Sequence, residues 1–236
     1  MLNERVVVPT LAISEVFGPT LQGEGPSAGE RAGFVRLGRC NLACEWCDTK
    51  YTWDWDTYDP QVEVSTRSLA DIAAEIEAME VPLVVVTGGE PLLQQSHLPG
   101  LLARLRSTGH DIEIETAGTV APSDEVVALV DRFNVSPKLD NSGNALDRRY
   151  RPDVLRAFEA TGKAVFKFVV VEESDLNEVS AIVEDCLLSE VWIMPEGTDA
   201  AVLLDRQRRL ADAVIARGWH MTTRLHILLW GDQRGH

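Results

Sequence analysis

Residues 33–49 read GFVRLGRCNLACEWCDT, and the interpretation of the chain starts from this stretch. Its first five residues alternate in a way that predicts a β-strand. Cys40, Cys44 and Cys47 follow directly, with the spacing C-x3-C-x2-C. Structural zinc and ordinary [4Fe–4S] electron carriers usually take four cysteine or histidine ligands, and the sequence has no second CxxC-like pair. Three thiolates on a four-iron cluster would leave one iron open for a substrate.

The fourth cysteine, Cys186, lies in a leucine-rich predicted helix, where we expect a small buried side chain rather than a ligand. Disulfide frameworks spread their cysteines to close loops, whereas here three fall within eight residues. The spacing therefore predicts metal or cofactor ligation in a reducing compartment. A zinc site of three cysteines completed by a distant histidine is the alternative.

Short apolar runs alternate with amphipathic ones along the rest of the chain. They predict strands at 11–17, 33–37, 83–87, 111–116, 133–135, 164–171, 191–194 and 225–230, and helices at 68–79, 98–107, 123–130, 152–161, 176–187 and 200–217. Repeated strand–helix units imply parallel strands joined by helical crossovers. About six units predict an α/β fold, a partial, open (β/α)6 TIM-like barrel, with a doubly wound sheet as the alternative. We expect one domain over residues 1–236, with a core at about 11–230.

The composition is that of an acidic globular protein. Among 236 residues, 45% are hydrophobic, and 22 Lys and Arg stand against 37 Asp and Glu, for a net charge of −15. Such a surface repels phosphate backbones, so nucleic acid is not expected as a partner. No apolar run is long enough for a membrane span, and residues 1–10 carry a valine run at 6–8 but no signal-peptide layout. We expect a cytoplasmic protein that does not bind membranes.

Four further motifs accompany the cysteines: TLQGEG at 20–25, TGGEP at 87–91, ETAG at 115–118 and SPK at 136–138. Together with the cysteine spacing they resemble the radical S-adenosylmethionine (SAM) superfamily, and within it the 7-carboxy-7-deazaguanine synthase family. The resemblance extends from about residue 13 to residue 230. It implies the radical SAM barrel, a [4Fe–4S] cluster, SAM and Mg²⁺.

The resemblance also implies roles for individual residues. Those expected at the pterin substrate are Leu21, Gln22, Gly23, Glu24, Arg36, Thr87 and His226. Those expected at SAM are Trp46, Cys47, Asp48, Gly89, Glu90, Glu115, Ser136 and Lys138. The expected metal ligands are Cys40, Cys44 and Cys47 for the cluster and Thr49 for Mg²⁺. No side chain is expected as the catalytic group, because the reactive species of the family is the 5′-deoxyadenosyl radical.

The implied enzyme is a carbon–nitrogen lyase of queuosine and 7-deazapurine biosynthesis. It would contract the ring of 6-carboxy-5,6,7,8-tetrahydropterin to 7-carboxy-7-deazaguanine with loss of ammonia. The family is usually homodimeric and takes its electron from a flavodoxin or ferredoxin. Two alternatives are an activase of glycyl-radical enzymes and a zinc- or iron–sulfur-binding module without enzyme activity.

Several residues have a plain structural interpretation beside the functional one. Arg36 and Glu115 could be charges on the solvent side of their strands, and His226 could be a hydrogen-bonded histidine at the sheet edge. Lys167 could point into the barrel or out to solvent. The loop around Trp53 and Trp55 could cap the site or serve packing. His97, His110, His220 and His236 have no motif context and are expected to be structural. Residues 231–236 are expected to form an untied tail, and no substrate contact of the family is transferred to them.

Overall fold

The computed structural model describes residues 9–236, and the valine run at 6–8 lies outside them. Within the described residues, one sheet of nine strands forms the centre of the molecule. In chain order the strands are β1 (Thr10–Leu21), β2 (Arg31–Leu37), β3 (Ser65–Ser68), β4 (Leu83–Gly88), β5 (Asp111–Thr116), β6 (Arg132–Val135), β7 (Ala164–Val170), β8 (Val191–Pro195) and β9 (His220–Met221).

The strands lie in the order β3-β1-β2-β4-β5-β6-β7-β8-β9. From β2 to β9 every strand is parallel to its neighbour. The strand β1 is antiparallel to both β2 and β3. Because β3 and β9 end the order on opposite sides, the sheet curves without closing. The predicted open, TIM-like α/β barrel is confirmed.

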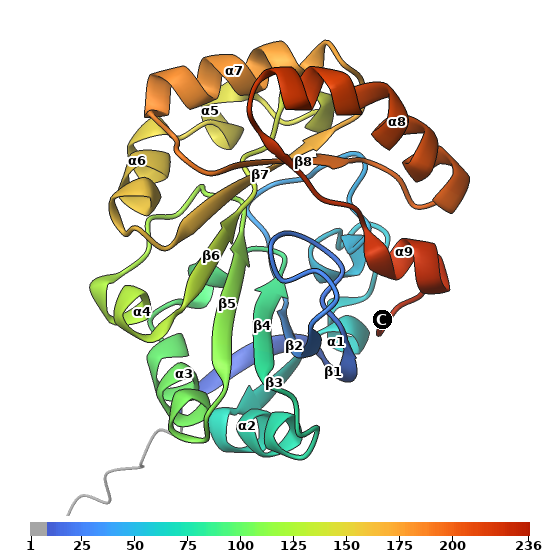
Figure 1. Cartoon of the computed structure of the whole chain (residues 1–236). Helices are drawn as coiled ribbons and strands as arrows, with labels where there is room; N and C mark the ends of the chain where they lie inside the picture. The colour runs from blue at the N-terminus through green and yellow to red at the C-terminus, as the bar shows by residue number, and fades with distance from the viewer. Residues whose placement is uncertain (1–8) are drawn as a thin grey trace, which may run out of the picture.

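Helices cover the outer face of the curved sheet (Figure 1). The α-helices are α1 (Pro60–Glu63), α2 (Leu69–Glu77), α3 (Leu98–Ser107), α4 (Asp124–Leu129), α5 (Leu146–Arg149), α6 (Pro152–Ala160), α7 (Asp175–Cys186), α8 (Ala200–Ala216) and α9 (Leu225–Trp230). Three 3-10 turns, η1 (Lys50–Thr52), η2 (Pro91–Gln94) and η3 (Asp140–Ser142), lie in the connecting loops.

The helix α2 illustrates how local sequence sets these elements. The Ser68 hydroxyl accepts the Asp71 backbone N–H at 3.1 Å and donates to the Asp71 carboxylate at 2.7 Å. This exchange satisfies a donor that the first helical turn would otherwise leave free. Leu69 and Ile76 then lie on the buried face of the helix. The predicted helix start is confirmed.

Strand β5 shows how charged side chains come to lie inside the barrel. Its residues Ile112 and Ile114 belong to the large core between the sheet and the helices. Successive side chains of a strand point to opposite faces, so Glu113 and Glu115 point into the barrel. The apolar face of β5 is thus buried under helices, and its other face carries two carboxylates.

The prediction of a strand at residues 225–230 is wrong, because these residues form helix α9. The last strand is β9, which pairs residues 220 and 221 with Trp192 and Ile193 of β8. Residues 225–230 read LHILLW, a short apolar run whose length suits a buried strand and a helix equally. The following residue, Gly231, ends the helix.

The prediction of an untied tail is also wrong. The Arg234 guanidinium donates to the Glu15 carboxylate at 3.2 Å and to the Glu63 carboxylate at 2.8 Å, and it lies 3.9 Å from the centre of the Tyr51 ring. These contacts hold the last residues against β1 and α1. Separately, none of the helices described is both long and apolar enough to cross a membrane.

Candidate active site

A cavity opens at the carboxyl ends of the parallel strands, the place where barrel enzymes carry their active sites. All the site residues predicted from the sequence line it, except Glu90. They are Leu21, Gln22, Gly23, Glu24, Arg36, Cys40, Cys44, Trp46, Cys47, Asp48, Thr49, Thr87, Gly89, Glu115, Ser136, Lys138 and His226. Segments from opposite ends of the chain therefore meet in one hollow, as the contact of Glu24 with Arg224, 200 residues apart in sequence, illustrates.

The three clustered cysteines line one wall of the cavity. Each sulfur accepts one N–H: Cys40 from the Leu42 backbone at 3.4 Å, Cys44 from an amide side chain at 3.3 Å and Cys47 from an indole at 3.3 Å. Burial raises the pKa of the Cys40 thiol to about 12 and also raises that of Cys44. A bound metal centre would hold these thiols as thiolates.

The donor set fits an iron–sulfur cluster. Three soft sulfur ligands stand in a small apolar cluster with Leu42 and Ala117, which limits contact with water. Within residues 9–236, no three His, Cys, Asp or Glu side chains stand close enough to hold a single metal ion. Thiolates that bind different irons of one cluster do not need that closeness. The prediction that Cys186 is buried is confirmed, with 1% of the residue exposed.

The two glycines at the end of β4 pack against β2 and the cysteine loop that follows it. A Cβ atom on Gly89 would stand 2.1 Å from the Arg39 carbonyl oxygen, so no other residue fits there without a backbone shift. The Gly89 N–H donates to the Leu37 carbonyl at 3.1 Å, and the Glu90 N–H to that of Arg39 at 2.9 Å. The glycine turn and the cysteine loop therefore form one unit.

Glu90 is fully buried behind this turn. Its carboxylate accepts the backbone N–H of Leu92 at 3.0 Å, that of Ala117 at 2.8 Å and the Thr116 hydroxyl at 2.8 Å. Burial raises the pKa of this carboxyl. The geometry assigns Glu90 to support of the loops that line the cavity, and its predicted contact with SAM stays a prediction.

Glu24 forms the centre of an ionic network on the opposite wall. It pairs with the Lys167 ammonium, and it accepts the Arg224 Nε–H at 3.2 Å. Arg224 also pairs with Asp48, which follows Cys47. Although burial alone would raise the pKa of Glu24, the two cations hold it well below its usual value. Glu24 is therefore a carboxylate throughout the physiological pH range.

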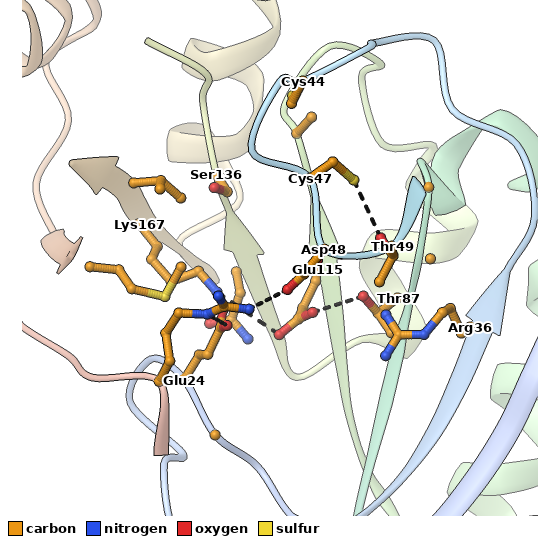
Figure 2. Close-up of a pocket in the computed structure, with 18 of the residues that line it drawn as sticks. Glu24, Arg36, Cys44, Cys47, Asp48, Thr49, Thr87, Glu115, Ser136 and Lys167 are labelled. Atoms are coloured by element: carbon orange, nitrogen blue, oxygen red, sulfur yellow. Dashed lines mark hydrogen bonds and ion pairs between the residues drawn. The ribbon is translucent and has the colours of Figure 1, made fainter. Parts of the chain in front are cut away.

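Glu115 lies between this network and the strand β4 (Figure 2). It accepts the Thr87 hydroxyl at 2.8 Å and the Gln22 side-chain amide at 3.2 Å, and the Lys167 ammonium is 4.0 Å away. Both Glu115 and Lys167 point into the barrel. The solvent-facing alternatives for the two residues are wrong.

Arg36 also faces the cavity rather than solvent. Its Nε–H donates to the Glu15 carboxylate at 2.6 Å, and Glu15 accepts the Tyr51 hydroxyl at 2.7 Å as well. The guanidinium lies 5.2 Å from the centre of the Phe17 ring. Ion pairing and stacking thus fix the plane of the guanidinium at the mouth of the barrel.

His226 enters the cavity from α9, not from a sheet edge. A Cβ atom on Gly23 would stand 2.1 Å from its Nδ1, so the glycine leaves room for the ring to cross the 20–25 loop. The Leu225 N–H donates to the Gly23 carbonyl at 2.8 Å and joins the two segments. Burial lowers the pKa of His226, so the ring is neutral near pH 7.

Several cavity residues were not predicted as site residues. They are Phe17, Phe34, Leu42, Trp53, Gly88, Thr116, Ala117, Asn134, Lys167, Val169, Met194, Glu196, Arg224 and His236. Lys167 and Arg224 extend the charge network. For Lys167 the sequence signal is alternation along a strand, which leaves two faces open. Arg224 immediately precedes helix α9, where a strand was predicted, so the sequence carried no correct signal for it. His236 lines the cavity and stacks on Trp230, with 5.0 Å between ring centres. The ion pairs of Arg234 with Glu15 and Glu63 hold the tail so that His236 reaches the cavity.

Known proteins share both the sequence pattern and the fold of this chain. The radical SAM superfamily matches residues 35–169. The 7-carboxy-7-deazaguanine synthase of Pyrobaculum aerophilum is 37% identical, covering 96% of this chain and 98% of that protein. The enzyme of the same name from Halobacterium salinarum is 35% identical, covering 95% and 92%. The crystal structure of QueE from Escherichia coli is similar with a TM-score of 0.69 and 28% identity, over 92% of this chain and 95% of that one.

Proposed function

The chain belongs to the 7-carboxy-7-deazaguanine synthase family of radical SAM lyases, and from this membership we propose its reaction and the task of each site residue. The proposed substrate is 6-carboxy-5,6,7,8-tetrahydropterin, and the products are 7-carboxy-7-deazaguanine and ammonia. Substrate and products contain the same atoms and the same number of electrons. No external oxidant is consumed, which agrees with the use of SAM as a regenerated cofactor.

The observation that carries the proposal is the arrangement of the cavity. The thiols of Cys40, Cys44 and Cys47 stand on one wall, and the ionised Glu24 and the fixed Arg36 flank the space in front of them. When bound, the cluster and SAM would supply the 5′-deoxyadenosyl radical for hydrogen abstraction at the carbon that bears the substrate carboxylate. The chain itself binds, orients and shields the reactants.

Arg36 and Glu24 would hold opposite ends of the pterin. The Nε–H of Arg36 is used by Glu15, which leaves the terminal N–H groups to pair with the substrate carboxylate. Glu24 is kept ionised by Lys167 and Arg224, so it accepts N–H bonds from the amino-pyrimidine edge. A substrate held at both ends has one carbon facing the cysteine wall.

SAM would lie between the cysteine loop and the ends of β4 to β6. Trp46 and Lys138 border this space, and the Lys138 ammonium lies 5.4 Å from the centre of the Trp46 ring. Lys138 also donates to the Ser136 hydroxyl at 2.9 Å, which orients the ammonium. We assign Lys138 to the SAM carboxylate and the glycine turn at 88–89 to its amino group.

Thr49 is proposed as a Mg²⁺ ligand. Its hydroxyl lies 3.6 Å from the Cys47 sulfur at the edge of the cavity (Figure 2). A hydroxyl is a weak ligand for a hard cation, so water and the substrate carboxylate would complete the coordination shell. The cation would neutralise the charge of that carboxylate next to Asp48. We further propose a cytoplasmic homodimer that takes electrons from a flavodoxin or ferredoxin.

Anaerobic reconstitution followed by a product assay tests the reaction. We expect the carboxypterin to yield the deazaguanine and ammonia in the presence of SAM, Mg²⁺ and a reductant, with no net loss of SAM. The Cys44→Ser variant is expected to lose the cluster and the product. The matched control, Cys186→Ala, removes the buried cysteine of α7 and is expected to keep both. A loaded protein that consumes SAM without making the deazaguanine would overturn the proposal.

A further inference from the structure

Two of the three clustered thiols receive hydrogen bonds from side chains outside the cysteine motif. The Trp53 indole donates its Nε1–H to the Cys47 sulfur at 3.3 Å. The Asn144 side chain donates its Nδ2–H to the Cys44 sulfur at 3.3 Å. We propose that Trp53 and Asn144 are positioning residues that raise the reduction potential of the bound cluster. The inference rests on the proposed cluster at these cysteines and goes beyond it.

Trp53 is held in place by the turn η1. The Thr52 N–H and hydroxyl donate to the Thr49 carbonyl at 2.9 and 2.8 Å, and the Trp53 N–H donates to the Lys50 carbonyl at 3.0 Å. The Arg39 N–H donates to the Thr52 carbonyl at 2.6 Å and joins the turn to the start of the cysteine loop. An indole N–H is a donor only, and a half-buried one needs an acceptor. The Cys47 sulfur meets that need.

The Asn144 amide is fixed at both ends. Its Oδ1 accepts the Ala43 backbone N–H at 2.9 Å while its Nδ2 donates to Cys44. The reverse orientation would place the amide nitrogen against the Ala43 N–H, a contact of two donors, so the hydrogen bonds assign the amide. The amide nitrogen therefore faces the sulfur. It carries two hydrogens, and the Ser142 hydroxyl, 3.2 Å away, is a second acceptor.

A buried arginine holds the segment that carries Asn144. Arg149 is 4% exposed, and it donates to the Asn144 carbonyl at 3.1 Å, the Lys138 carbonyl at 3.2 Å and the Asp140 carboxylate at 3.1 Å. Along the same segment, the Ser142 carbonyl accepts the Glu45 N–H at 3.0 Å. The cysteine loop is thus docked onto residues 138–149, far away in sequence.

The direction of the effect follows from charge. One-electron reduction adds negative charge to the cluster and its thiolate sulfurs. An N–H that points at a sulfur stabilises the more negative state, so each donor raises the potential. The Leu42 N–H on Cys40 belongs to the backbone and stays in any variant. The Trp53 and Asn144 donors are side chains, so substitution can remove them singly.

The test is a potentiometric titration of the reconstituted protein, followed by electron paramagnetic resonance (EPR) of the reduced cluster. Trp53→Phe keeps a ring and loses the N–H. We expect the equilibrium constant for one-electron reduction of the cluster to fall about three- to tenfold in this variant. A tenfold fall corresponds to a reduction potential lower by about 59 mV. Trp55→Phe, in the same loop but 38% exposed, is the control with no expected change. Asn144→Ala should shift the potential in the same direction.

A second readout reports the hydrogen bond directly. In protein labelled with ¹⁵N-indole tryptophan, pulsed EPR should show a nitrogen coupling in the wild type and in Trp55→Phe that disappears in Trp53→Phe. An unchanged potential in a fully loaded Trp53→Phe protein overturns the inference. If that variant cannot hold a cluster, absence of the coupling in the wild type overturns it instead. Neither readout requires the pterin, so failure of the proposed reaction would be seen separately.

Discussion

The Arg36 guanidinium donates its Nε–H to the Glu15 carboxylate at 2.6 Å, from β2 to the antiparallel strand β1. The same carboxylate accepts the Tyr51 hydroxyl and the Arg234 Nε–H. Burial alone would raise the pKa of Glu15, but Arg36 and these donors lower it, so the group is ionised. One acidic residue therefore orients the arginine at the mouth of the barrel and anchors the carboxyl-terminal tail.

Replacing Glu15 with glutamine should weaken substrate binding without affecting the cluster. The amide carries no charge, so the guanidinium loses a charge-assisted bond and its fixed plane. We expect KM for the carboxypterin to rise about tenfold, equivalent to ~1.4 kcal/mol, with kcat nearly unchanged. Steady-state kinetics measure KM and kcat, and the iron content of the variant shows whether the cluster is retained. An unchanged KM would show that Glu15 does not position Arg36.

The tail should limit access of solvent to the cavity. Arg234 is 44% exposed, and each of its ion pairs is worth only about 0.2–1 kcal/mol, so Arg234→Ala would free residues 232–236 part of the time. We expect the ratio of 5′-deoxyadenosine to deazaguanine product to rise about two- to fivefold, because the reductant in solution can then reach and quench the radical. Chromatography of a single reaction mixture gives both quantities.

Arg217→Ala is the matched control for the tail. Arg217 also lies over an aromatic ring, that of Trp219 at 5.6 Å, but it caps the end of α8 and does not line the cavity. Its variant should leave the ratio unchanged. Equal ratios in the two variants would argue against a shielding role for the tail.

Lys167→Met should leave a buried carboxylate without its main partner. Lys167 is 4% exposed and pairs with Glu24, and breaking one side of such a pair costs about 3 kcal/mol. We expect a corresponding loss in the free energy of unfolding and a higher KM, because Glu24 would then bind a proton more readily. Urea unfolding and kinetics measure the two effects.

The double variant Lys167→Met, Glu24→Gln separates the two effects. It removes both charges, so most of the stability should return while KM stays high. Recovery of the wild-type KM in the double variant would contradict the proposed substrate contact of Glu24.

Much of the fold could be predicted because it follows from local patterns. The Ser68–Asp71 exchange and the alternation along β5 each act within a few residues, and so does the cysteine spacing. Helix α9 could not be predicted, because a run of six mostly apolar residues is too short for its periodicity to distinguish a helix from a buried strand. Its first residue, Leu225, donates its backbone N–H to the carbonyl of Gly23, about two hundred residues away, a contact that no local pattern predicts.

The orientation of side chains in the site was harder to predict than their identity. All residues of β7 after Ala164 are buried, so burial does not tell which face of the strand Lys167 lies on. Arg224 pairs with Asp48 and Glu24, which both lie in loops near the other end of the chain. Only the curvature of the open barrel brings these charges together, and a single sequence does not encode that curvature locally.

His226 should make the stability of the protein depend on pH. Burial lowers its pKa in the folded state, whereas an unfolded histidine titrates near 6.5. Below that value the unfolded state binds more protons than the folded one, so the stability contributed by the neutral ring is present at higher pH. It is lost as the pH falls through about 6.5 toward the lowered pKa, and the slope of this loss is at most about 1.4 kcal/mol per pH unit.

His226→Gln removes this proton uptake, so its melting temperature should fall less between about pH 7.5 and about pH 5.5 than that of the wild type. Scanning calorimetry of the reconstituted proteins under anaerobic conditions measures the difference, and effects of acid on the cluster are common to both. His97→Gln, at an exposed histidine, is the control and should follow the wild-type slope. If the melting temperature of His226→Gln falls with pH as steeply as that of the wild type, the His226 ring gains its proton equally easily in the folded and unfolded states. That result would contradict the burial of His226 in the cavity.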